Sequence, residues 1–421
     1  MQIRKMNSVS GEITVPGDKS ISHRAVMLSS LADGASDITG FLKGADCLAT
    51  IDCFRKMGID IEVSDEVITV HGKGMKGLKK PCEMLYAGNS GTTTRLLCGI
   101  LSAQSFDSSI TGDESIQKRP MKRVTQPLSL MGANIENEYC PLYIKGGKLN
   151  GIDYKMTVAS AQVKTALILA ALFADSETVI YEKEKSRDHT ELMLKAMGAN
   201  IEVDNLKITV NKTDSLKAQD IRVPGDISSA AFFLVLGSIM PDSEITIKNV
   251  GLNPTRSGII DVLCDMGADI NIENERCEAG ESVGDIRVRS AKLHGVKVGG
   301  AIIPRLIDEI PVIAAAALFA EGETVIYDAK ELKVKETDRI QAVVDEFKKC
   351  GADITATDDG MIINGGKPLC GANFKTYGDH RMAMSLAIVA QLASGESTLD
   401  DAECVSVSYP NFFDDFYSIE K

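Results

Sequence analysis

Runs of small apolar residues alternate along this chain with short segments in which apolar and polar residues take turns. The apolar runs are Ala25–Ala32, Thr93–Ser102, Thr165–Ala174, Ala230–Ile239, Val312–Ala320 and a run that begins at Met382. We predict that these runs form buried helices. The alternating segments have the two-residue period of a strand with one buried face. Strands that alternate with helices predict an α/β fold.

A glycine recurs at the same place in this pattern, directly after a helix and directly before an alternating segment. The copies are MGIDI from Met57, MGANI from Met131 and again from Met197, MGADI from Met266 and CGADI from Cys350. Glycine fits the position just beyond a helix, where the backbone often turns left-handed. We therefore predict six repeated α/β units, three in each half of the chain, with the last one shortened.

A second repeat marks the start of each half. Val15-Pro16-Gly17-Asp18 and Val223-Pro224-Gly225-Asp226 are each followed by a Ser-rich turn and an Ala-rich apolar segment. Because the first copy lies near the N-terminus, the C-terminal half is expected to recruit the opening strand. We predict one domain at 18–224 and another at 1–17 plus 225–421. The two connections between them are expected to form a hinge.

Composition narrows the classes of function. The net charge of −13 over 421 residues argues against a general nucleic-acid binder, so an anionic ligand would need a local cationic pocket. The N-terminus lacks the apolar core of a signal peptide. The longest apolar runs have about half the length of a membrane span. We therefore expect neither a nucleic-acid partner nor a membrane.

The ten cysteines form no CxxC pair, and no histidine spacing completes a zinc pattern. We expect free thiols, most of them buried, with Cys98 and Cys264 in apolar helical contexts. Free thiols are typical of a reducing compartment, which favours a cytoplasmic location. We expect no bound metal.

Cationic and small polar residues gather where apolar helices are expected to begin. The segment GDKSISHRA (17–25) places Lys19, Ser20 and Arg24 at a helix start, where free N–H groups and the helix dipole favour anions. The alternative is a capped helix with solvated cations. In AGNSGTTTRLL (87–97), the backbone at Gly88 and Gly91 would allow close approach of an anion, although a plain turn would look the same.

Two further segments of the first half carry candidate binding residues. QKRPMKR (117–123) is a basic cluster that includes Arg119, and a solvated patch is its alternative interpretation. VASAQVKTAL (158–167) places Ser160, Ala161 and Gln162 at another helix start, where neutral hydrogen-bonding groups suit substrate hydroxyls. A simple helix cap at Ser160 would give the same pattern.

The second half contributes both carboxylates and cations. LKVKETDRI (332–340) places Lys335, Glu336 and Arg339 within one helical turn, either as a site or as a surface salt-bridge face. The corresponding copy in the first half, KEKSRDHTEL, carries Ser186, Arg187 and His189 instead. YGDHRMAM (377–384) begins a helix with Asp379, His380 and Arg381. Asp308 lies in the apolar segment IIPRLIDEIPV, where a carboxylate is either costly or useful.

These motifs, in this order and at this spacing, resemble the 5-enolpyruvylshikimate-3-phosphate synthase family over essentially the whole chain. The resemblance rests on GDKSISHRA, GNSGTTTR, KRP, ASAQVKTAL, VPGDISSAAFF, VKETDR and DHRMAM. It implies the two-domain enolpyruvyl transferase fold, in which each domain holds three βαβαββ units around a pseudo-threefold axis. A double-strand hinge joins the two domains in this fold.

The same resemblance implies a transferase of the shikimate pathway, which leads to chorismate and the aromatic amino acids. The carboxyvinyl group of phosphoenolpyruvate would move to the 5-hydroxyl of shikimate 3-phosphate with release of phosphate. No cofactor or metal is implied. Gly91 is retained where glyphosate-tolerant members of the family often have alanine, so we expect glyphosate to compete with phosphoenolpyruvate.

Residue roles follow from the resemblance. The catalytic residues would be Lys19, Asp308 as the base for the 5-hydroxyl, and Glu336 as the acid toward C3 of phosphoenolpyruvate. Shikimate 3-phosphate would contact Lys19, Ser20, Arg24, Ser160, Ala161, Gln162, Ser186, Arg187, Asp308 and Lys335. Phosphoenolpyruvate would contact Lys19, Asn89, Gly91, Arg119, Gln162, Arg339, His380 and Arg381. Val407 stands where many members have a late lysine.

Two other functions fit the fold class. The sister enzyme, UDP-N-acetylglucosamine 1-carboxyvinyltransferase, usually carries a cysteine in a mobile loop, but here that loop reads TGDESIQKRP. A non-catalytic binding relative would be expected to lose Asp308 or Glu336, and both are present. We therefore expect the two small-molecule substrates and glyphosate as the ligands of a monomer.

Overall fold

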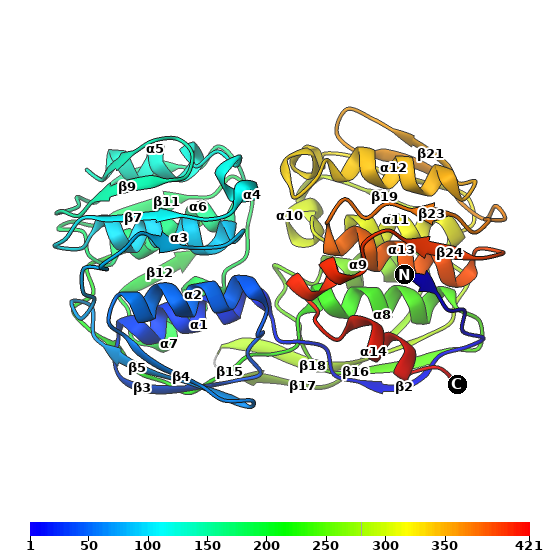
Figure 1. The fold of residues 1–421 in the computed structure, drawn as a ribbon, viewed down its shortest axis with the longest axis horizontal. Helices are drawn as coiled ribbons and strands as arrows, with labels where there is room; N and C mark the ends of the chain where they lie inside the picture. Colours follow the sequence, from blue (N-terminus) through cyan, green and yellow to red (C-terminus); the bar gives the residue numbers. More distant parts are fainter. Residues whose placement is uncertain (279) are drawn as a thin grey trace. The chain divides into compact units, whose positions relative to one another are not determined.

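The computed structural model describes residues 1–278 and 280–421, and the chain divides into two compact units (Figure 1). The N-terminal unit consists of Gly17–Val223 and Glu278–Glu281. The C-terminal unit consists of Met1–Pro16, Pro224–Cys277 and Ser282–Lys421. The crossings after residues 16 and 223 each lie one residue from the boundaries expected from the sequence.

The segment Glu278–Glu281 differs from that expectation, which placed it in the C-terminal domain. Its ends are held by ion pairs to the N-terminal unit. Glu278 Oε1 lies 3.5 Å from Arg222 Nη1, and Glu281 Oε1 lies 2.6 Å from His189 Nδ1. The facing ends of β17 (Asp269–Glu278) and β18 (Glu281–Arg289) are thus attached to a unit other than that of the rest of these strands, and the sequence pattern of the strands does not reveal it.

The N-terminal unit contains three sheets that share one topology. In each, a short edge strand runs parallel to a central strand, and a hairpin follows antiparallel to it. In spatial order the strands are β14 (Leu216–Lys217), β3 (Ala32–Thr39), β5 (Val67–Lys73) and β4 (Asp60–Val63), with β15 (Ile221–Arg222) also beside β3; β6 (Leu85–Tyr86), β7 (Ser108–Thr111), β9 (Leu142–Lys145) and β8 (Asn134–Glu136); and β10 (Asp153–Lys155), β11 (Thr178–Tyr181), β13 (Lys207–Val210) and β12 (Ile201–Asp204).

The C-terminal unit repeats this plan. Its sheets are β17 (Asp269–Glu278), β18 (Glu281–Arg289), β16 (Glu244–Gly251) and β2 (Ser10–Ile13); β19 (Lys297–Val298), β20 (Glu323–Ile326), β22 (Met361–Asn364) and β21 (Asp353–Ala356); and β1 (Gln2–Ile3), β24 (Ser397–Leu399) and β23 (Asn373–Phe374). The opening strands β1 and β2 therefore complete two sheets of this unit, as predicted. β2 lies parallel to β16, with Ser10 opposite Glu244 and Ile13 opposite Ile247. The last sheet is the shortened one.

Helices of the N-terminal unit are α1 (Lys19–Leu31), α2 (Ala45–Lys56), α3 (Gly91–Ser102), α4 (Glu114–Gln117), α5 (Lys122–Leu130), α6 (Ala161–Ala171) and α7 (His189–Ala196). Those of the C-terminal unit are α8 (Ile227–Ile239), α9 (Gly258–Asp265), α10 (Ile303–Leu306), α11 (Ile310–Phe319), α12 (Arg339–Lys349), α13 (His380–Leu392) and α14 (Phe412–Ser418), with 3₁₀ turns η1 (Gly300–Ile302), η2 (Lys330–Val334) and η3 (Glu403–Val407).

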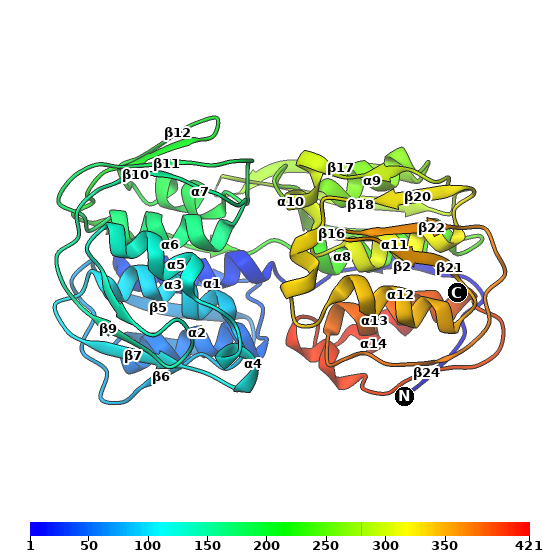
Figure 2. The ribbon, with the colours of Figure 1, turned by 90° about the horizontal axis from the view of Figure 1, so that it is seen from above.

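The six apolar helices are α1, α3 and α6 in the first unit and α8, α11 and α13 in the second. Within its own unit, α3 packs against α1 and α6, and α11 packs against α8 and α13 (Figure 2). All six begin earlier than the apolar runs predicted. The residues added at their starts are mostly polar or small and give little hydrophobic signal, except in α11, where they are Ile310 and Pro311. Several candidate binding residues, among them Lys19, Ser20, Gly91 and Ala161, are therefore inside first helical turns.

The recurring glycine takes the predicted left-handed backbone in all five copies. The φ angles are +87° at Gly58, +94° at Gly132, +85° at Gly198, +95° at Gly267 and +90° at Gly351. A residue with a Cβ is strained in this region, so the repeated glycine sets the exit of the chain from each helix.

Each unit has its own hydrophobic core. All ten cysteines are free in the described structure, but only five of them are buried, and Cys98 is among these five. Cys264 is exposed, contrary to the prediction, because it lies near the end of α9 on the face turned from the core. Within residues 1–278 and 280–421, no helix combines the length and the apolar character needed to cross a bilayer.

One close approach fixes how α3 meets α6. A Cβ added at Gly99 of α3 would lie 2.2 Å from the carbonyl oxygen of Ala166 on α6. That distance is far inside van der Waals contact, and the obstacle is backbone that cannot rotate away. The two helices can therefore pack this closely only with glycine at position 99.

We predict that Gly99→Ala lowers the free energy of unfolding by about 1–3 kcal/mol, the usual cost of overpacking. Gly147→Ala is the matched control, because nothing lies within 4 Å of its added Cβ. Urea unfolding of both variants measures the effect. An unfolding midpoint of Gly99→Ala equal to that of the control would contradict this account of the α3–α6 packing.

Candidate active site

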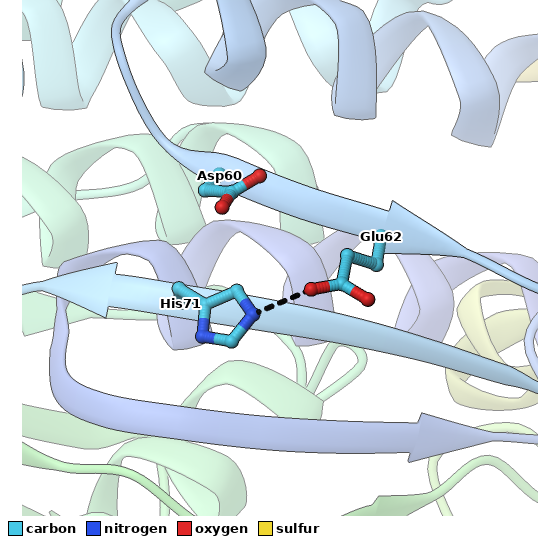
Figure 3. Close-up of side chains that lie close together, drawn as sticks. All are labelled: Asp60, Glu62 and His71. Atoms are coloured by element: carbon cyan, nitrogen blue, oxygen red, sulfur yellow. Dashed lines mark hydrogen bonds and ion pairs between the residues drawn. The ribbon is translucent and has the colours of Figure 1, made fainter.

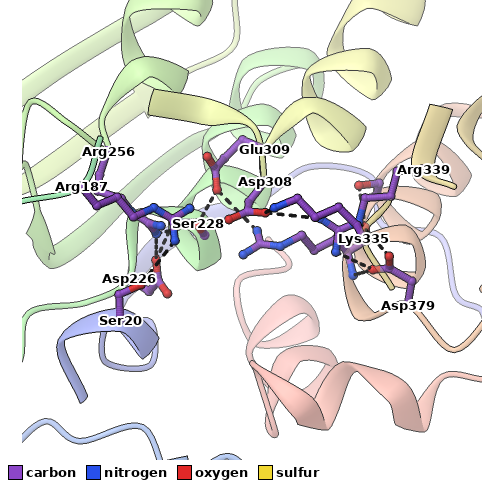
Figure 4. Close-up of polar contacts among 12 residues, drawn as sticks. Ser20, Arg187, Asp226, Ser228, Arg256, Asp308, Glu309, Lys335, Arg339 and Asp379 are labelled. Carbon is purple, nitrogen blue, oxygen red and sulfur yellow. Dashed lines mark hydrogen bonds and ion pairs between the residues drawn. The ribbon is translucent and has the colours of Figure 1, made fainter. Parts of the chain in front are cut away.

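The start of α1 places two candidate residues on its first turn. The Asp18 carboxylate caps the helix by accepting a hydrogen bond of 2.8 Å from the Ile21 N–H. Lys19 forms an ion pair with Asp46 at the start of α2. Ser20 Oγ accepts a hydrogen bond of 3.3 Å from Arg187 Nη1, so the loop before α7 reaches this helix start (Figure 4).

Arg24 is buried one turn further along α1 and is bound by three neutral oxygens. Its Nε donates to Thr190 Oγ1 at 2.7 Å, its Nη1 to the Ser20 carbonyl at 2.9 Å and its Nη2 to Thr165 Oγ1 at 2.9 Å. Burial is the main reason that the pKa of Arg24 falls to about 10. The side chain still carries its positive charge at neutral pH and holds α1, α6 and α7 together.

The starts of α3 and α6 form a second cluster. Arg95 Nη1 donates to Gln162 Oε1 at 2.7 Å, and Gln162 Nε2 donates to Thr92 Oγ1 at 3.0 Å. Burial, helped by the nearby charge of Arg119, lowers the pKa of Arg95 to about 10. A Cβ at Gly91 would lie 2.7 Å from Arg95 Nη1 and 3.7 Å from Arg119 Nη1. Position 91 is thus bordered by two guanidinium groups.

The remaining residues predicted in this unit lie close by in the chain. Ser160 caps α6 by accepting a hydrogen bond of 3.4 Å from the Val163 N–H, so the interpretation as a helix cap is correct for this side chain. Ala161 is the first residue of α6, and Asn89 lies in the loop before α3. Arg119 Nη2 donates to Ser115 Oγ at 3.1 Å.

In the C-terminal unit, Asp308, Lys335, Glu336 and Arg339 form one hydrogen-bonded cluster (Figure 4). Asp308 Oδ1 accepts from Lys335 Nζ at 2.9 Å and from Arg339 Nη1 at 3.4 Å. Glu336 Oε2 accepts from Arg339 Nη2 at 2.7 Å. The predicted base and the predicted acid are therefore both bound to one guanidinium group.

Asp379 anchors that guanidinium from the start of α13. Arg339 Nε and Nη2 donate to the two Asp379 oxygens at 2.8 and 3.2 Å. Burial disfavours the charge of Arg339, but Asp379 and Glu336 outweigh it, and the pKa of Arg339 lies above its ordinary value. For Asp379, burial is likewise outweighed by Arg339, and the pKa of this carboxyl lies below its ordinary value.

Arg381 and the second VPGD copy belong to a neighbouring chain of contacts. Arg381 Nη1 lies 3.4 Å from Glu309 Oε1, which also accepts from the Ser228 hydroxyl. Arg256 Nη2 in turn donates to Ser228 Oγ and to Asp226 Oδ1, each at 2.7 Å. His380, the first residue of α13, is buried. Both VPGD copies thus use their aspartate as a helix cap, and the second copy carries Ile227 and Phe232 where the first carries Lys19 and Arg24.

Sequence reasoning noted three further residues of these clusters but did not include them among the predicted site residues. Arg95 lies inside GNSGTTTR, four residues after Gly91, and its place one helical turn from Gly91 was an available signal. Glu309 is adjacent to Asp308 in the same apolar segment, and it is the more deeply buried of the two. Asp379 was expected only as a helix cap, and its ion pair with Arg339 could not be read from a separation of 40 residues.

Among the described residues, the group of His, Cys, Asp and Glu side chains close enough to share one ion is Asp60, Glu62 and His71 (Figure 3). They lie on β4 and β5, and His71 Nε2 is 3.1 Å from Glu62 Oε1. Both carboxylates are exposed. None of the three belongs to the clusters described above or to the residues predicted from the sequence.

Two units of three repeated sheets, with cations held at the starts of their central helices, define a protein of the enolpyruvyl transferase class. Residues 3–416 match the sequence profile of the family described as EPSP synthase (3-phosphoshikimate 1-carboxyvinyltransferase). The chain therefore belongs to the EPSP synthase family and is a transferase. The alternative with a nucleotide-sugar acceptor is not favoured by this match.

Similar proteins cover the chain almost completely. It is 57% identical over 420 residues to a 3-phosphoshikimate 1-carboxyvinyltransferase of Geobacillus kaustophilus, which covers 98% of each chain. It is 53% identical over 419 residues to the protein of the same name from a Thermoanaerobacter species, which covers 99% of each. The solved structure of EPSP synthase from Acinetobacter baumannii matches with a TM-score of 0.91 and 45% identity, over 100% of this chain and 98% of that one.

We predict that Asp379→Asn lowers the free energy of unfolding at pH 7 by about 3 kcal/mol, because Arg339 loses a buried carboxylate partner. The pKa of Asp379 is lower in the folded than in the unfolded chain, so its pairing stabilises the fold at neutral pH. That contribution disappears as the pH falls through the folded-state value. Chemical denaturation at several pH values should therefore show the difference between wild type and variant shrinking below about pH 4.

Asp338→Asn is the matched control for this experiment. Asp338 caps α12 through a hydrogen bond of 3.2 Å from the Gln341 N–H, and asparagine caps a helix about as well as aspartate. We expect this control to unfold like the wild type at neutral pH. If Asp379→Asn were as stable as Asp338→Asn at pH 7, the buried ion pair would not have the stabilising role assigned to it.

Proposed function

We propose that this protein transfers the carboxyvinyl group of phosphoenolpyruvate to the 5-hydroxyl of shikimate 3-phosphate and releases phosphate. The observation that carries the proposal is the cluster of Asp308, Lys335, Glu336 and Arg339, in which two carboxylates and two cations are hydrogen-bonded together. Such a cluster offers a proton acceptor, a proton donor and anion-binding groups within one site. Family membership supplies the chemistry to which they would apply.

Both substrates are anions, so a site that holds them together must offset their repulsion with positive charge. Guanidinium groups suit this task because they bind phosphate and carboxylate through two parallel hydrogen bonds. In the proposal, shikimate 3-phosphate contacts Ser20, Arg24 and Arg187 of the N-terminal unit.

Its other proposed contacts are Lys19, Ser160, Ala161, Gln162, Ser186, Asp308 and Lys335. The proposed phosphoenolpyruvate contacts are Lys19, Asn89, Gly91, Arg119, Gln162, Arg339, His380 and Arg381. Arg95 is not itself one of these proposed contacts, but it orients one of them, because it donates a hydrogen bond to the Gln162 amide oxygen.

The addition step of the reaction needs one proton removed from the 5-hydroxyl and one proton added to C3 of phosphoenolpyruvate. Asp308 accepts hydrogen bonds from Lys335 and Arg339, and two cationic donors favour the carboxylate form that a base requires. It would take the proton of the 5-hydroxyl as that oxygen attacks C2 of phosphoenolpyruvate, while Glu336 protonates C3. Loss of a proton from C3 and of phosphate from C2 would then restore the double bond in the product.

The bond from Arg339 to Glu336 favours a carboxylate at position 336, whereas an acid must carry a proton. We propose that phosphoenolpyruvate resolves this conflict. Its anionic groups would compete for the Arg339 guanidinium, and Glu336 would then gain a proton more easily. In this proposal Arg339 has two tasks: it binds the substrate and it tunes the acid.

We predict that Glu336→Gln and Asp308→Ala each reduce kcat by about 10²-fold or more, the usual contribution of a positioned acid or base. Phosphate release from phosphoenolpyruvate in the presence of shikimate 3-phosphate measures this. Glu323→Gln, an exposed change on β20 of the same unit, is the control and should turn over like the wild type. Near-normal turnover of either site variant would mean that its role is assigned wrongly.

We predict that glyphosate inhibits the enzyme by competing with phosphoenolpyruvate. It is a compact anion, and the small space at Gly91 between Arg95 and Arg119 is kept open by the missing Cβ. Initial rates at several concentrations of both compounds test this, with competitive inhibition as the expected pattern. Turnover that stays unchanged at saturating glyphosate would refute it.

The monomeric state and the cytoplasmic location expected from the sequence belong to the same proposal. Sedimentation of the purified protein tests the monomeric state.

A further inference from the structure

A lysine with no exposed surface lies at the centre of a buried ionic cluster in the N-terminal unit. Lys164 is on the first turn of α6, and its side chain is 0% exposed. Its Nζ lies 2.7 Å from Glu191 Oε1 on α7 and 3.1 Å from Glu182 Oε2, directly after β11. Both carboxylates are buried as well. Burying three ionisable groups is costly unless they are well paired, so the cluster calls for a structural or functional reason.

The cluster binds every polar group of one loop residue. Glu182 Oε1 accepts from the Ser186 N–H at 3.0 Å and from the Ser186 hydroxyl at 2.5 Å. Lys164 Nζ donates to the Ser186 carbonyl at 3.2 Å. Residues 183–188 form neither helix nor strand. The position of this loop therefore depends on the cluster and not on a backbone ladder.

The next residue in that loop is Arg187, whose Nη1 donates to Ser20 Oγ at the start of α1. Thr190, one residue before Glu191, accepts from Arg24 Nε. The buried cluster thus holds Ser186, the neighbour of Arg187 in the chain, and contains Glu191, the neighbour of the Thr190 that binds Arg24. Arg187 and Arg24 are the two arginines of this unit assigned to shikimate 3-phosphate. A long arginine side chain binds a phosphate well only if its backbone is held in place.

We propose that Lys164 and Glu182 are positioning residues that hold Ser186 and Arg187 for the phosphate of shikimate 3-phosphate. This inference rests on the proposed function. Lys164 and Glu182 do not touch the substrate in this scheme. They act through the Ser186 backbone and hydroxyl, and their contribution concerns the phosphate, not the reacting hydroxyl or phosphoenolpyruvate.

The test compares the affinities for shikimate 3-phosphate and for shikimate, which lacks the phosphate, by calorimetry on the full chain. We expect Glu182→Ala to lower the ratio of the two affinities by about tenfold or more, a change of one unit in the logarithm of the binding constant. Glu182→Gln should recover part of the ratio, because its amide oxygen still accepts from Ser186 although its amide nitrogen faces Lys164. If Glu182→Ala fails to fold, Lys164→Met takes its place, because it keeps the length of the buried side chain and removes the bond to the Ser186 carbonyl.

Two comparisons separate positioning from general damage. Glu346 is a fully buried carboxylate of the C-terminal unit that accepts from Lys349, the Lys375 N–H and Tyr377, so Glu346→Ala should reduce stability and leave the ratio unchanged. Arg187→Ala should lower the ratio, and adding Glu182→Ala to it should lower the ratio little further, because both changes remove the same contact.

The outcomes distinguish this inference from the proposed function. A wild-type chain that binds both ligands equally would overturn the proposed function and this inference with it. A wild-type preference for the phosphorylated ligand that persists undiminished in Glu182→Ala would overturn this inference alone. If Glu182→Ala does not fold, an undiminished preference in Lys164→Met would do the same. Equal losses of the ratio in Glu182→Ala and Glu346→Ala would also overturn it.

Discussion

A buried cation must be hydrogen-bonded, and the type of oxygen that binds it decides whether it can still attract an anion. Arg24 is bound by hydroxyl and carbonyl oxygens, so its charge is stabilised without being neutralised in place. Arg339 is bound by three carboxylates, so an anion would reach its guanidinium group only by competing with them. The opposite displacements of their pKa values, down for Arg24 and up for Arg339, express this difference. In a chain of net charge −13, anion binding has to be created locally, and the choice of partners for each arginine creates it.

This constraint also explains why the central helices pack so closely. Several proposed binding residues, such as Lys19, Gly91 and Ala161, lie on the first turn of an apolar helix, and the helix can bring its start close to a neighbour only if their surfaces are small. The contact between Gly99 and the Ala166 carbonyl meets that need for α3 and α6. Gln162 on α6 then accepts a hydrogen bond from Arg95 on α3, and this bond joins the first turns of the two helices. The low aromatic content of the chain is consistent with this style of packing.

The repeats could be predicted from the sequence because the same short signals occur many times. The glycine after each helix has one physical reason, a left-handed backbone, and its φ angle agrees in all five copies. Helix starts were placed too late, because residues such as Lys19 and Ser20 give no hydrophobic signal even though they are helical. The attachment of Glu278–Glu281 to the N-terminal unit depends on ion pairs between residues far apart in the chain, and such pairs leave no local pattern.

The residues of the candidate site also divide into those that the sequence identified and those that it did not. The family resemblance identified Asp308, Glu336 and Arg339, and the structure adds the bonds that couple them. Asp379 and Lys164 were not identified, because each is a charged residue whose partner is brought near only by folding. Lys164 pairs with Glu182 and Glu191 only in the folded chain, and the order of residues in the sequence does not indicate these pairs. Supporting residues of this kind are the part of a site that motif reasoning reaches last.

The strands β1 and β2 have a consequence for the order in which the protein is made. Residues 1–16 are synthesised before their partners in β16 and β24, which follow only after Gly17–Val223 of the N-terminal unit. Nearly all of that unit is one continuous segment, Gly17–Val223, which can collapse while translation continues. The strand β2 must wait unpaired until β16 is made, and β1 must wait until β24 completes the last-made sheet. Their polar character, with Ser10 and Glu12 exposed, suits a segment that spends time in water before it finds its place.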